Sequence, residues 1–248
     1  MKDYILECCV DSVESAINAE SGGASRIELC SNLIIGGTTP DFAIVREIRK
    51  HTAIRIHALI RPRFGDFCYS KHEMEIMKEQ IRSLKDAGVE GVVIGVLDED
   101  GNLNMDAMKE LIDVADGLSI TLHRAFDMCR DPYAALEDAI ALGVNTILTS
   151  GQKQSAWEGR ELLAELIQKA DGRIDIMAGA GIGASVIEKL IPATGGTSYH
   201  MSGKVTLDSK MKYRKSEVSM GLPSLSEYEI WQTSEDAVKA AVEVLQRS

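Results

Sequence analysis

Short runs of apolar residues alternate with amphipathic stretches along almost the whole chain, and this alternation limits the fold more than any other feature. Near-continuous apolar strands separated by helices indicate a parallel sheet that is covered by helices. Eight strand-like runs are found, at about Ile5–Val10, Arg26–Cys30, Ile54–Ile60, Gly91–Val96, Ser119–His123, Thr146–Leu148, Ile174–Ala178 and Thr197–Met201. Eight strand–helix units predict a single-domain α/β protein, a (β/α)8 TIM barrel spanning residues 1–248.

A helix is predicted after each strand. The predicted helices run from Ser12 to about Gly22, and over about Pro40–Lys50, His72–Ala87, Asp106–Ala115, Pro132–Leu142, Glu161–Lys169, Ala184–Leu190 and Glu235–Gln246. A doubly wound open sheet alternates in the same way, but a glycine-rich phosphate loop often follows its first strand. The first strand here is followed by Asp11-Ser12-Val13-Glu14, which cannot cradle a pyrophosphate. The barrel is therefore favoured.

One segment interrupts this rhythm. A long loop is expected over about residues 203–234, between the last strand and the last helix. Loops of this length in compact domains are typical of lids, binding loops or disordered segments. The topology of a barrel places the start of this segment on the face where the strands end.

Composition and charge exclude several classes of function. The formal net charge of -11 argues against a nucleic-acid or acidic-membrane surface, both of which require basic patches. No apolar run approaches the roughly 20 residues of a membrane span, and the chain passes almost directly from Met1 into a strand, so neither a membrane segment nor a signal peptide is expected. Five cysteines fit free thiols in a reducing compartment, so we expect a cytoplasmic protein. A homo-oligomer is left open.

Two Glu-x-Cys patterns stand at the ends of the first two strands. Side chains alternate along a strand, so Glu7 shares a face with Cys9, and Glu28 shares a face with Cys30. Neighbouring strands lie about 4.8 Å apart, so the two cysteines could bind one soft ion, and thiolates favour Cu(I) or zinc. The alternative is that both cysteines are small buried hydrophobic residues. Nothing in the sequence implies an organic cofactor.

The interior of a TIM barrel is mostly packed with aliphatic side chains. Polar residues at the carboxyl ends of its strands are therefore the candidates for chemistry. The fifth strand ends at His123-Arg124, and Asp127 follows three residues later. A histidine in this position can act as a general acid or base, or it can simply bond to a loop backbone. Ser150 ends the sixth strand, and His200 in the eighth strand carries the same ambiguity as His123.

Arg61 and Arg63, with Asp66, form the most densely charged loop. Two guanidinium groups near a barrel mouth are suited to a carboxylate or a phosphate, which arginine binds in a bidentate manner. An arginine–aspartate bridge that stabilises the loop is the alternative. The glycines of Gly179-Ala180-Gly181 precede a helix, where backbone N–H groups often bind phosphate, although a plain tight turn has the same composition.

Several longer motifs resemble the CutC family of copper homeostasis proteins. The similar segments are Glu7–Ser12, Arg26–Cys30, Gly36–Pro40, Ile60–Arg63 with Gly65–Phe67, Thr121–Asp127, Leu148–Gln152, Met177–Gly181 and Met211–Arg214. The resemblance implies a barrel of this kind, a cytoplasmic location, and Cu(I) binding through Cys9 and Cys30. Phe64 stands where glycine is frequent in that family, and Ala180 is at a position that varies with glycine.

Two hypotheses from different classes follow. In the first, the protein binds Cu(I) through Cys9 and Cys30. In the second, it is an enzyme acting on a small anionic or phosphorylated metabolite, with His123, Glu28 or Asp127 as catalytic groups. The substrate would then be bound by Arg61, Arg63, Arg124, Ser150, Gly179 and Gly181. A continuous pocket touching Arg61 and His123 is what the second hypothesis requires.

Overall fold

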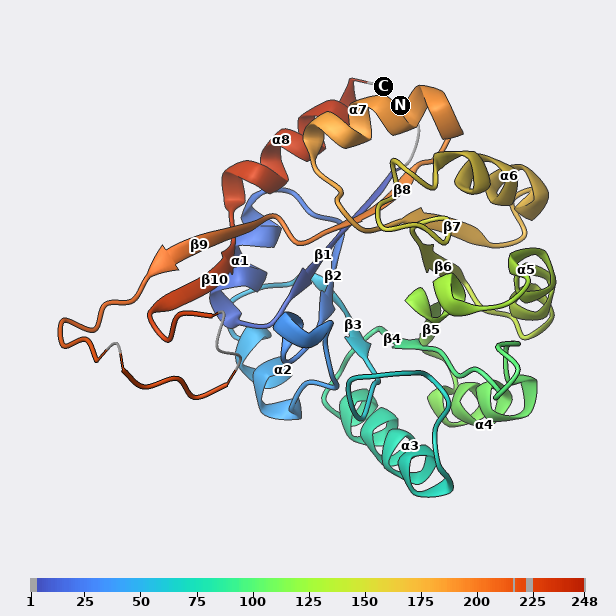
Figure 1. Ribbon diagram of the computed structural model, residues 1–248, viewed down its shortest axis with the longest axis horizontal. Coiled ribbons are helices and arrows are strands. Elements are labelled where there is room, and N and C mark those ends of the chain that lie inside the picture. Colours follow the sequence, from blue (N-terminus) through green and yellow to red (C-terminus); the bar gives the residue numbers. More distant parts are fainter. Residues whose placement is uncertain (1–3, 216, 222–224, 248) are drawn as a thin grey trace.

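Eight parallel strands close into a barrel in the order β1 to β8 in the computed structural model, which describes residues 4–215, 217–221 and 225–247 (Figure 1). The predicted (β/α)8 fold is confirmed, while residues 1–3, 216, 222–224 and 248 of the predicted domain lie outside the described part. The strands are β1 (Ile5–Val10), β2 (Arg26–Leu29), β3 (Arg55–Leu59), β4 (Gly91–Ile94), β5 (Ser119–Leu122), β6 (Thr146–Thr149), β7 (Asp175–Ala178) and β8 (Ser198–Met201).

Helices cover the outside of the barrel (Figure 1). They are α1 (Val13–Ser21), α2 (Phe42–Ile48), α3 (Lys71–Asp86), α4 (Met105–Ala115), α5 (Pro132–Ala141), α6 (Arg160–Ala170), α7 (Ala184–Thr194) and α8 (Glu235–Gln246), with short 3-10 turns η1 (Leu33–Ile35) and η2 (Arg124–Met128). Polar caps fix several starts: the Ser70 and Glu73 side chains each accept the other residue's backbone N–H at α3. Asp41 caps α2, which therefore begins at Phe42 and not at Pro40 as expected.

The apolar core lies between the sheet and the helices. Leu6, Cys8 and Val10 of β1 belong to this core, together with Ala16 and Ala19 of α1. Because side chains alternate along a strand, Glu7 and Cys9 face the inside of the barrel.

The inside of the barrel is polar where β1, β2, β3 and β8 meet. The register pairs Glu7 with Arg26 and with His200, and Glu28 with His57. All four of the acidic and basic residues Glu7, Arg26, Glu28 and His57 are buried. The expected aliphatic interior is therefore wrong for this part of the barrel.

The segment expected as a long loop contains two further strands. β9 (Lys204–Asp208) and β10 (Glu229–Thr233) pair antiparallel, and Leu207 lies opposite Ile230. We call residues 204–215, 217–221 and 225–233 the arm, because Figure 1 shows these segments extending away from the barrel at the left. Among the described residues, no helix has the length and apolar character needed to cross a membrane.

Candidate functional site

A cavity of about 240 Å³ opens where the barrel strands end, and we call it the mouth cavity. It is lined by Cys9, Glu28, Cys30, Leu33, Gly36, Leu59, Arg61, Phe67, His123, Arg124, Leu148 and His200. This one cavity thus brings together both cysteines that are expected to bind metal. It also contains two of the three expected catalytic residues, Glu28 and His123, and two of the three arginines, Arg61 and Arg124. The continuous pocket touching Arg61 and His123 that the enzyme hypothesis requires is present.

The two cysteines come from neighbouring strands. Cys9 lies opposite Glu28 in the register of β1 and β2, and the backbone N–H of Cys30 donates to the carbonyl of Val10 at 2.9 Å. Cys9 is half-buried, whereas Cys30 is buried and its thiol donates to the carbonyl oxygen of Glu28 at 3.8 Å. Burial, and then the negative charge of the Glu28 carboxylate, raises the pKa of the Cys30 thiol well above its usual value. Without a ligand, this sulfur therefore keeps its proton.

A buried ion-pair network lies directly beneath the cavity. The Glu7 carboxylate accepts from Arg26 Nε at 2.5 Å through one oxygen, and its other oxygen lies 2.8 Å from His200 Nδ1. The second imidazole nitrogen, His200 Nε2, lies 3.6 Å from a Glu28 oxygen. His200 therefore connects the interior pair to the lining of the cavity.

The two carboxyl groups of this network, Glu7 and Glu28, have pKa values shifted in opposite directions. Burial alone would raise the pKa of Glu7, but the hydrogen bond with His200 and the charge of Arg26 lower it to about 2. Burial outweighs the attraction of His200 at Glu28 and raises its pKa to about 7. Burial would lower the pKa of His200, yet the interactions with Cys9, Glu7 and Glu28 raise it well above the usual value. Glu28 is thus the group in this network that can exchange a proton near neutral pH.

Glu7, Glu28 and His200 also have the composition of a metal site. One ligand atom from each lies within 4.8 Å of the others. However, Arg26 already occupies one Glu7 oxygen and a protonated His200 the other, so a cation would have to displace two existing positive groups. The arrangement is that of an ion-pair network.

His123 lines the cavity as a neutral imidazole. Its Nδ1 accepts the backbone N–H of Ala125 at 3.1 Å, so Nε2 carries the proton. That Nε2 is buried and has no hydrogen-bond partner among the described residues. Burial, and then the charge of Arg61, lowers the pKa of His123 to about 3. This geometry favours a hydrogen-bond donor to a ligand over the acid–base role expected from sequence.

The space for the His123 ring depends on a glycine. A Cβ at Gly95 would lie 2.5 Å from the ring, so a side chain there would displace the imidazole. The Phe67 ring also packs against the imidazole, with its centroid 4.8 Å from that of the His123 ring. The orientation of His123 is therefore fixed by packing as well as by its backbone bond.

Arg61 organises the rim of the cavity. Its guanidinium donates to the carbonyls of Gly37 at 3.0 Å and Gly65 at 2.9 Å, and it lies over the Phe67 ring at 5.1 Å. Its Nε is buried and has no partner among the described residues. Part of the expected binding capacity is therefore used by loop backbone, while one N–H and the positive charge remain at the cavity.

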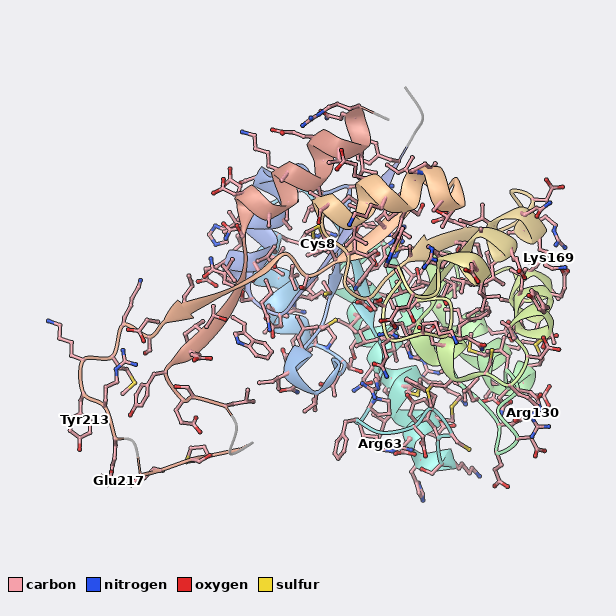
Figure 2. The ribbon with its side chains drawn as sticks, turned by 45° about the horizontal axis from the view of Figure 1, so that its top comes forward. Cys8, Arg63, Arg130, Lys169, Tyr213 and Glu217 are labelled. Atoms are coloured by element: carbon pink, nitrogen blue, oxygen red, sulfur yellow. The ribbon has the colours of Figure 1, made fainter. Side chains whose placement is uncertain are left out.

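Arg63 is directed away from this space. Its guanidinium donates to Asp66 at 2.9 Å and to Glu73 at 2.6 Å, and it also donates to loop carbonyls. Figure 2 shows Arg63 at the edge of the molecule. It does not line the mouth cavity. Of the two interpretations left open by the sequence, the structure supports a loop-stabilising bridge.

Asp127 is surrounded by donors and also lies outside the lining of the cavity. Its carboxylate accepts from Thr149 Oγ1 at 2.5 Å, from the backbone and hydroxyl of Ser150 at 3.0 Å, and from Arg124 Nε at 2.7 Å. A carboxylate with this many bonds is suited to joining loops, so the structure gives Asp127 and Ser150 an architectural role. Arg124 is held by both of them and reaches the cavity.

Gly179 and Gly181 lie in the loop between β7 and α7, and neither belongs to the lining of the cavity. A Cβ at Gly179 would lie 2.6 Å from Leu148 Cδ1, and Gly181 has a φ of 72° that favours glycine. Among the described residues, no side chain caps α7 at Gly183. Packing and backbone geometry account for these glycines, and phosphate binding there stays a prediction.

A second cavity of about 200 Å³ adjoins the first. Cys9 and Leu33 line both cavities, and the arm contributes Lys204 and Trp231 to the second. The Lys204 ammonium lies 3.3 Å from the centre of the Trp231 ring. Sequence reasoning did not identify these arm residues, because only the fold brings residues 204 and 231 to the barrel mouth.

Comparison with known proteins gives a consistent picture. A family model described as CutC family matches residues 4–205. A Homo sapiens protein named copper homeostasis protein cutC homolog is 46% identical over 228 residues, which cover 92% of this chain and 84% of that protein. A Vibrio campbellii protein named family protein CutC is 44% identical over 242 residues, 97% of this chain and 98% of that protein.

Solved structures agree with the fold. A crystal structure described as a putative copper homeostasis protein CutC from Streptococcus agalactiae has a TM-score of 0.77 at 28% identity, covering 81% of this chain and 99% of that one. Phosphoribosylanthranilate isomerase from Pyrococcus furiosus has a TM-score of 0.57 at 11% identity, covering 99% and 100%, and this likeness concerns the barrel alone.

Proposed function

The chain belongs to the CutC family, and from this membership we propose that it serves copper homeostasis by binding Cu(I) through Cys9 and Cys30. The observation that carries the proposal is that these two cysteines, from neighbouring strands, line one cavity. Thiolates are the ligands that soft Cu(I) prefers. In this proposal the protein works in the cytoplasm, where thiols stay reduced.

The proton on Cys30 gives this binding a characteristic pH dependence. Since burial and Glu28 raise the pKa of the thiol, Cu(I) must displace a proton to bind. Affinity should therefore rise about tenfold per pH unit for each proton released near neutral pH.

The test compares two double variants in competition with a chromophoric Cu(I) chelator under anaerobic conditions. Cys9→Ala/Cys30→Ala should lose stoichiometric Cu(I) binding. Cys68→Ala/Cys129→Ala, which removes two cysteines outside the lining of the cavity, should bind like the parent. Equal binding by both double variants would rule out the cavity cysteines as the Cu(I) ligands.

A second candidate function is supported by different groups of the same cavity. Cu(I) needs neither Nε2 of His123 nor Nε of Arg61, yet both nitrogens are buried at this site and have no hydrogen-bond partner in the described part of the chain. Two N–H donors beside a fixed positive charge are suited to an anion. Glu28, with a pKa of about 7, is suited to move a proton. These groups support an enzyme that acts on a small anionic metabolite.

Ligand-induced stabilisation tests this second candidate directly. Thermal unfolding would be followed with inorganic phosphate, pyruvate and citrate as probes. A probe present at about 100 times its Kd stabilises the folded state by about 2.7 kcal/mol, which raises Tm by about 5–10 °C in a chain of this size. The shift should disappear in Arg61→Met and persist in Arg55→Met, a matched arginine exposed on β3. Shifts of equal size in both variants would exclude Arg61 from anion binding.

A further inference from the structure

The mouth cavity is larger than Cu(I) alone requires. Its volume of about 240 Å³ corresponds to about eight water molecules, at roughly 30 Å³ each. A single ion held between Cys9 and Cys30 would occupy a small part of this space. The cavity therefore has room for an organic molecule beside the ion.

Two cysteines leave Cu(I) open to a further sulfur ligand. Soft Cu(I) favours thiolate and thioether ligands, and an ion bound by two thiolates can accept a third sulfur. Among the described residues that line the cavity there is no third cysteine and no methionine. Cys8 belongs to the apolar core outside the barrel, and Cys68 and Cys129 lie outside the lining. A third sulfur would therefore have to come from another molecule.

The side of the cavity across from the cysteines carries positive charge. Cys9 is on β1 and Arg124 follows β5, and the closed order β1 to β8 places these two strands on opposite sides of the barrel. Arg124 donates to Asp127 and Ser150 through Nε and Nη2, which leaves Nη1 with no partner among the described residues. Arg61, after β3, adds a second guanidinium, and its buried Nε has no partner in that part of the chain either.

This positive charge is local to the cavity. The chain as a whole has 38 Asp and Glu residues against 27 Lys and Arg residues, whereas the lining of the cavity has two arginines and one acidic residue, Glu28. The Glu28 carboxyl group itself lies beside His200. A cleft lined by one sign of charge concentrates ligands of the opposite sign. The cavity is therefore suited to an anionic group at the side opposite the cysteines.

We propose that the mouth cavity takes Cu(I) together with a small thiol that carries a carboxylate. The sulfur of this thiol binds the ion beside Cys9 and Cys30, and its carboxylate binds Arg124 and Arg61 through charge-assisted hydrogen bonds. The copper stays Cu(I), and each thiol that binds it releases its proton to solvent. Because this complex forms on Cu(I) held by the two cysteines, the inference rests on the function proposed above. The arginines, which Cu(I) alone does not need, thus have a role in the same complex.

Equilibrium dialysis with radiolabelled mercaptopropionate tests this complex, under anaerobic conditions and with the copper content measured in the same sample. The Cu(I)-loaded parent should retain one mercaptopropionate per Cu(I), and the parent without Cu(I) should retain almost none. Mercaptopropanol, which is neutral and similar in size, should bind about tenfold more weakly, because it lacks the charge-assisted bonds. X-ray absorption at the copper edge should show a third sulfur ligand only when mercaptopropionate is present.

Two arginines in the connection between β5 and α5 give a matched pair of variants. Arg124→Met removes a guanidinium that lines the cavity, whereas Arg130→Met removes an exposed one outside the lining, at the edge of the molecule in Figure 2. The ratio of retained mercaptopropionate to copper should fall about tenfold in Arg124→Met and stay at the parent value in Arg130→Met.

The outcomes separate this inference from the proposed function. A parent that binds no Cu(I) would refute both. A parent that binds Cu(I) but retains no mercaptopropionate would overturn the ternary complex alone. The same conclusion would follow if mercaptopropanol bound equally well, if mercaptopropionate were retained without Cu(I), or if the two arginine variants gave the same ratio.

Discussion

Replacing Glu7 with Gln tests the buried network beneath the mouth cavity. Glu7 is 0% exposed and is the shared partner of Arg26 and His200. Glutamine keeps the shape of the side chain but removes the negative charge, so two buried cations lose their common counter-ion. Breaking a buried ion pair on one side costs about 3–5 kcal/mol of stability.

The lowered pKa of Glu7 gives a similar value for the lost free energy of unfolding. Its value falls from 4.5 to about 2 on folding, and each unit of difference corresponds to about 1.4 kcal/mol, which gives about 3 kcal/mol. A lowered carboxyl pKa stabilises the fold fully above pH 4.5, and this stability is lost as the pH falls toward 2. The stability of the variant should therefore fall furthest below that of the parent near neutral pH.

Urea unfolding at pH 7 and pH 3.5 measures both expectations. At pH 7 Glu7→Gln should lower the free energy of unfolding by about 3 kcal/mol and Tm by about 10 °C. At pH 3.5 the difference between parent and variant should be smaller. Glu47→Gln, which breaks exposed contacts with Lys50 and His51, serves as the control and should show no measurable change. A loss below about 1 kcal/mol at pH 7, or a difference that does not shrink in acid, would refute the network as described.

Three further predictions follow. Folding raises the pKa of Glu28 from 4.5 to about 7, so this group should cost the parent about 3 kcal/mol of stability as the pH rises through that range. Urea titrations should show that Glu28→Gln abolishes this loss. Gly91→Ala places a Cβ 2.6 Å from the His57 ring and should cost about 1–3 kcal/mol, whereas Gly221→Ala meets no atom of the described residues within 4 Å and should unfold like the parent. Cu(I) affinity measured by chelator competition should rise between pH 6 and 8, and a flat profile would mean that Cys30 releases no proton.

The barrel could be predicted because its signal is local. Each strand and helix carries its own hydrophobic period, and eight repeats leave few alternatives. The short polar motifs at the strand ends are local too, so the sequence alone indicates Cys9, Cys30, Arg61 and His123 as candidates, and the fold brings all four to one cavity. The topology brings these residues together, since the parallel strands of a barrel all end on the same face.

The chemistry of individual side chains depended on distant partners. Glu7 and His200 are separated by 193 residues and meet only because β8 closes against β1. Asp127 is a catalytic candidate by its position after His123, but Thr149 and the loop after β6 supply hydrogen-bond donors to its carboxylate. Arg63 is fixed by Glu73 at the start of α3. In each case the type of residue was informative, while its role depended on contacts that a local pattern does not contain.

Glu28 connects the two candidate functions and separates them in a single variant. Its carboxylate helps to raise the pKa of Cys30, so Glu28→Gln should make the thiol easier to deprotonate and strengthen Cu(I) binding several-fold. An enzyme that uses Glu28 to move a proton would instead lose turnover by about 10²–10⁴-fold in the same variant. The first effect is an increase, which a general weakening of the fold cannot produce, and the second is a loss, so the two candidate functions are separated. If Glu28→Gln weakens Cu(I) binding while the variant is at least as stable as the parent at pH 6, the electrostatic account of Cys30 is wrong.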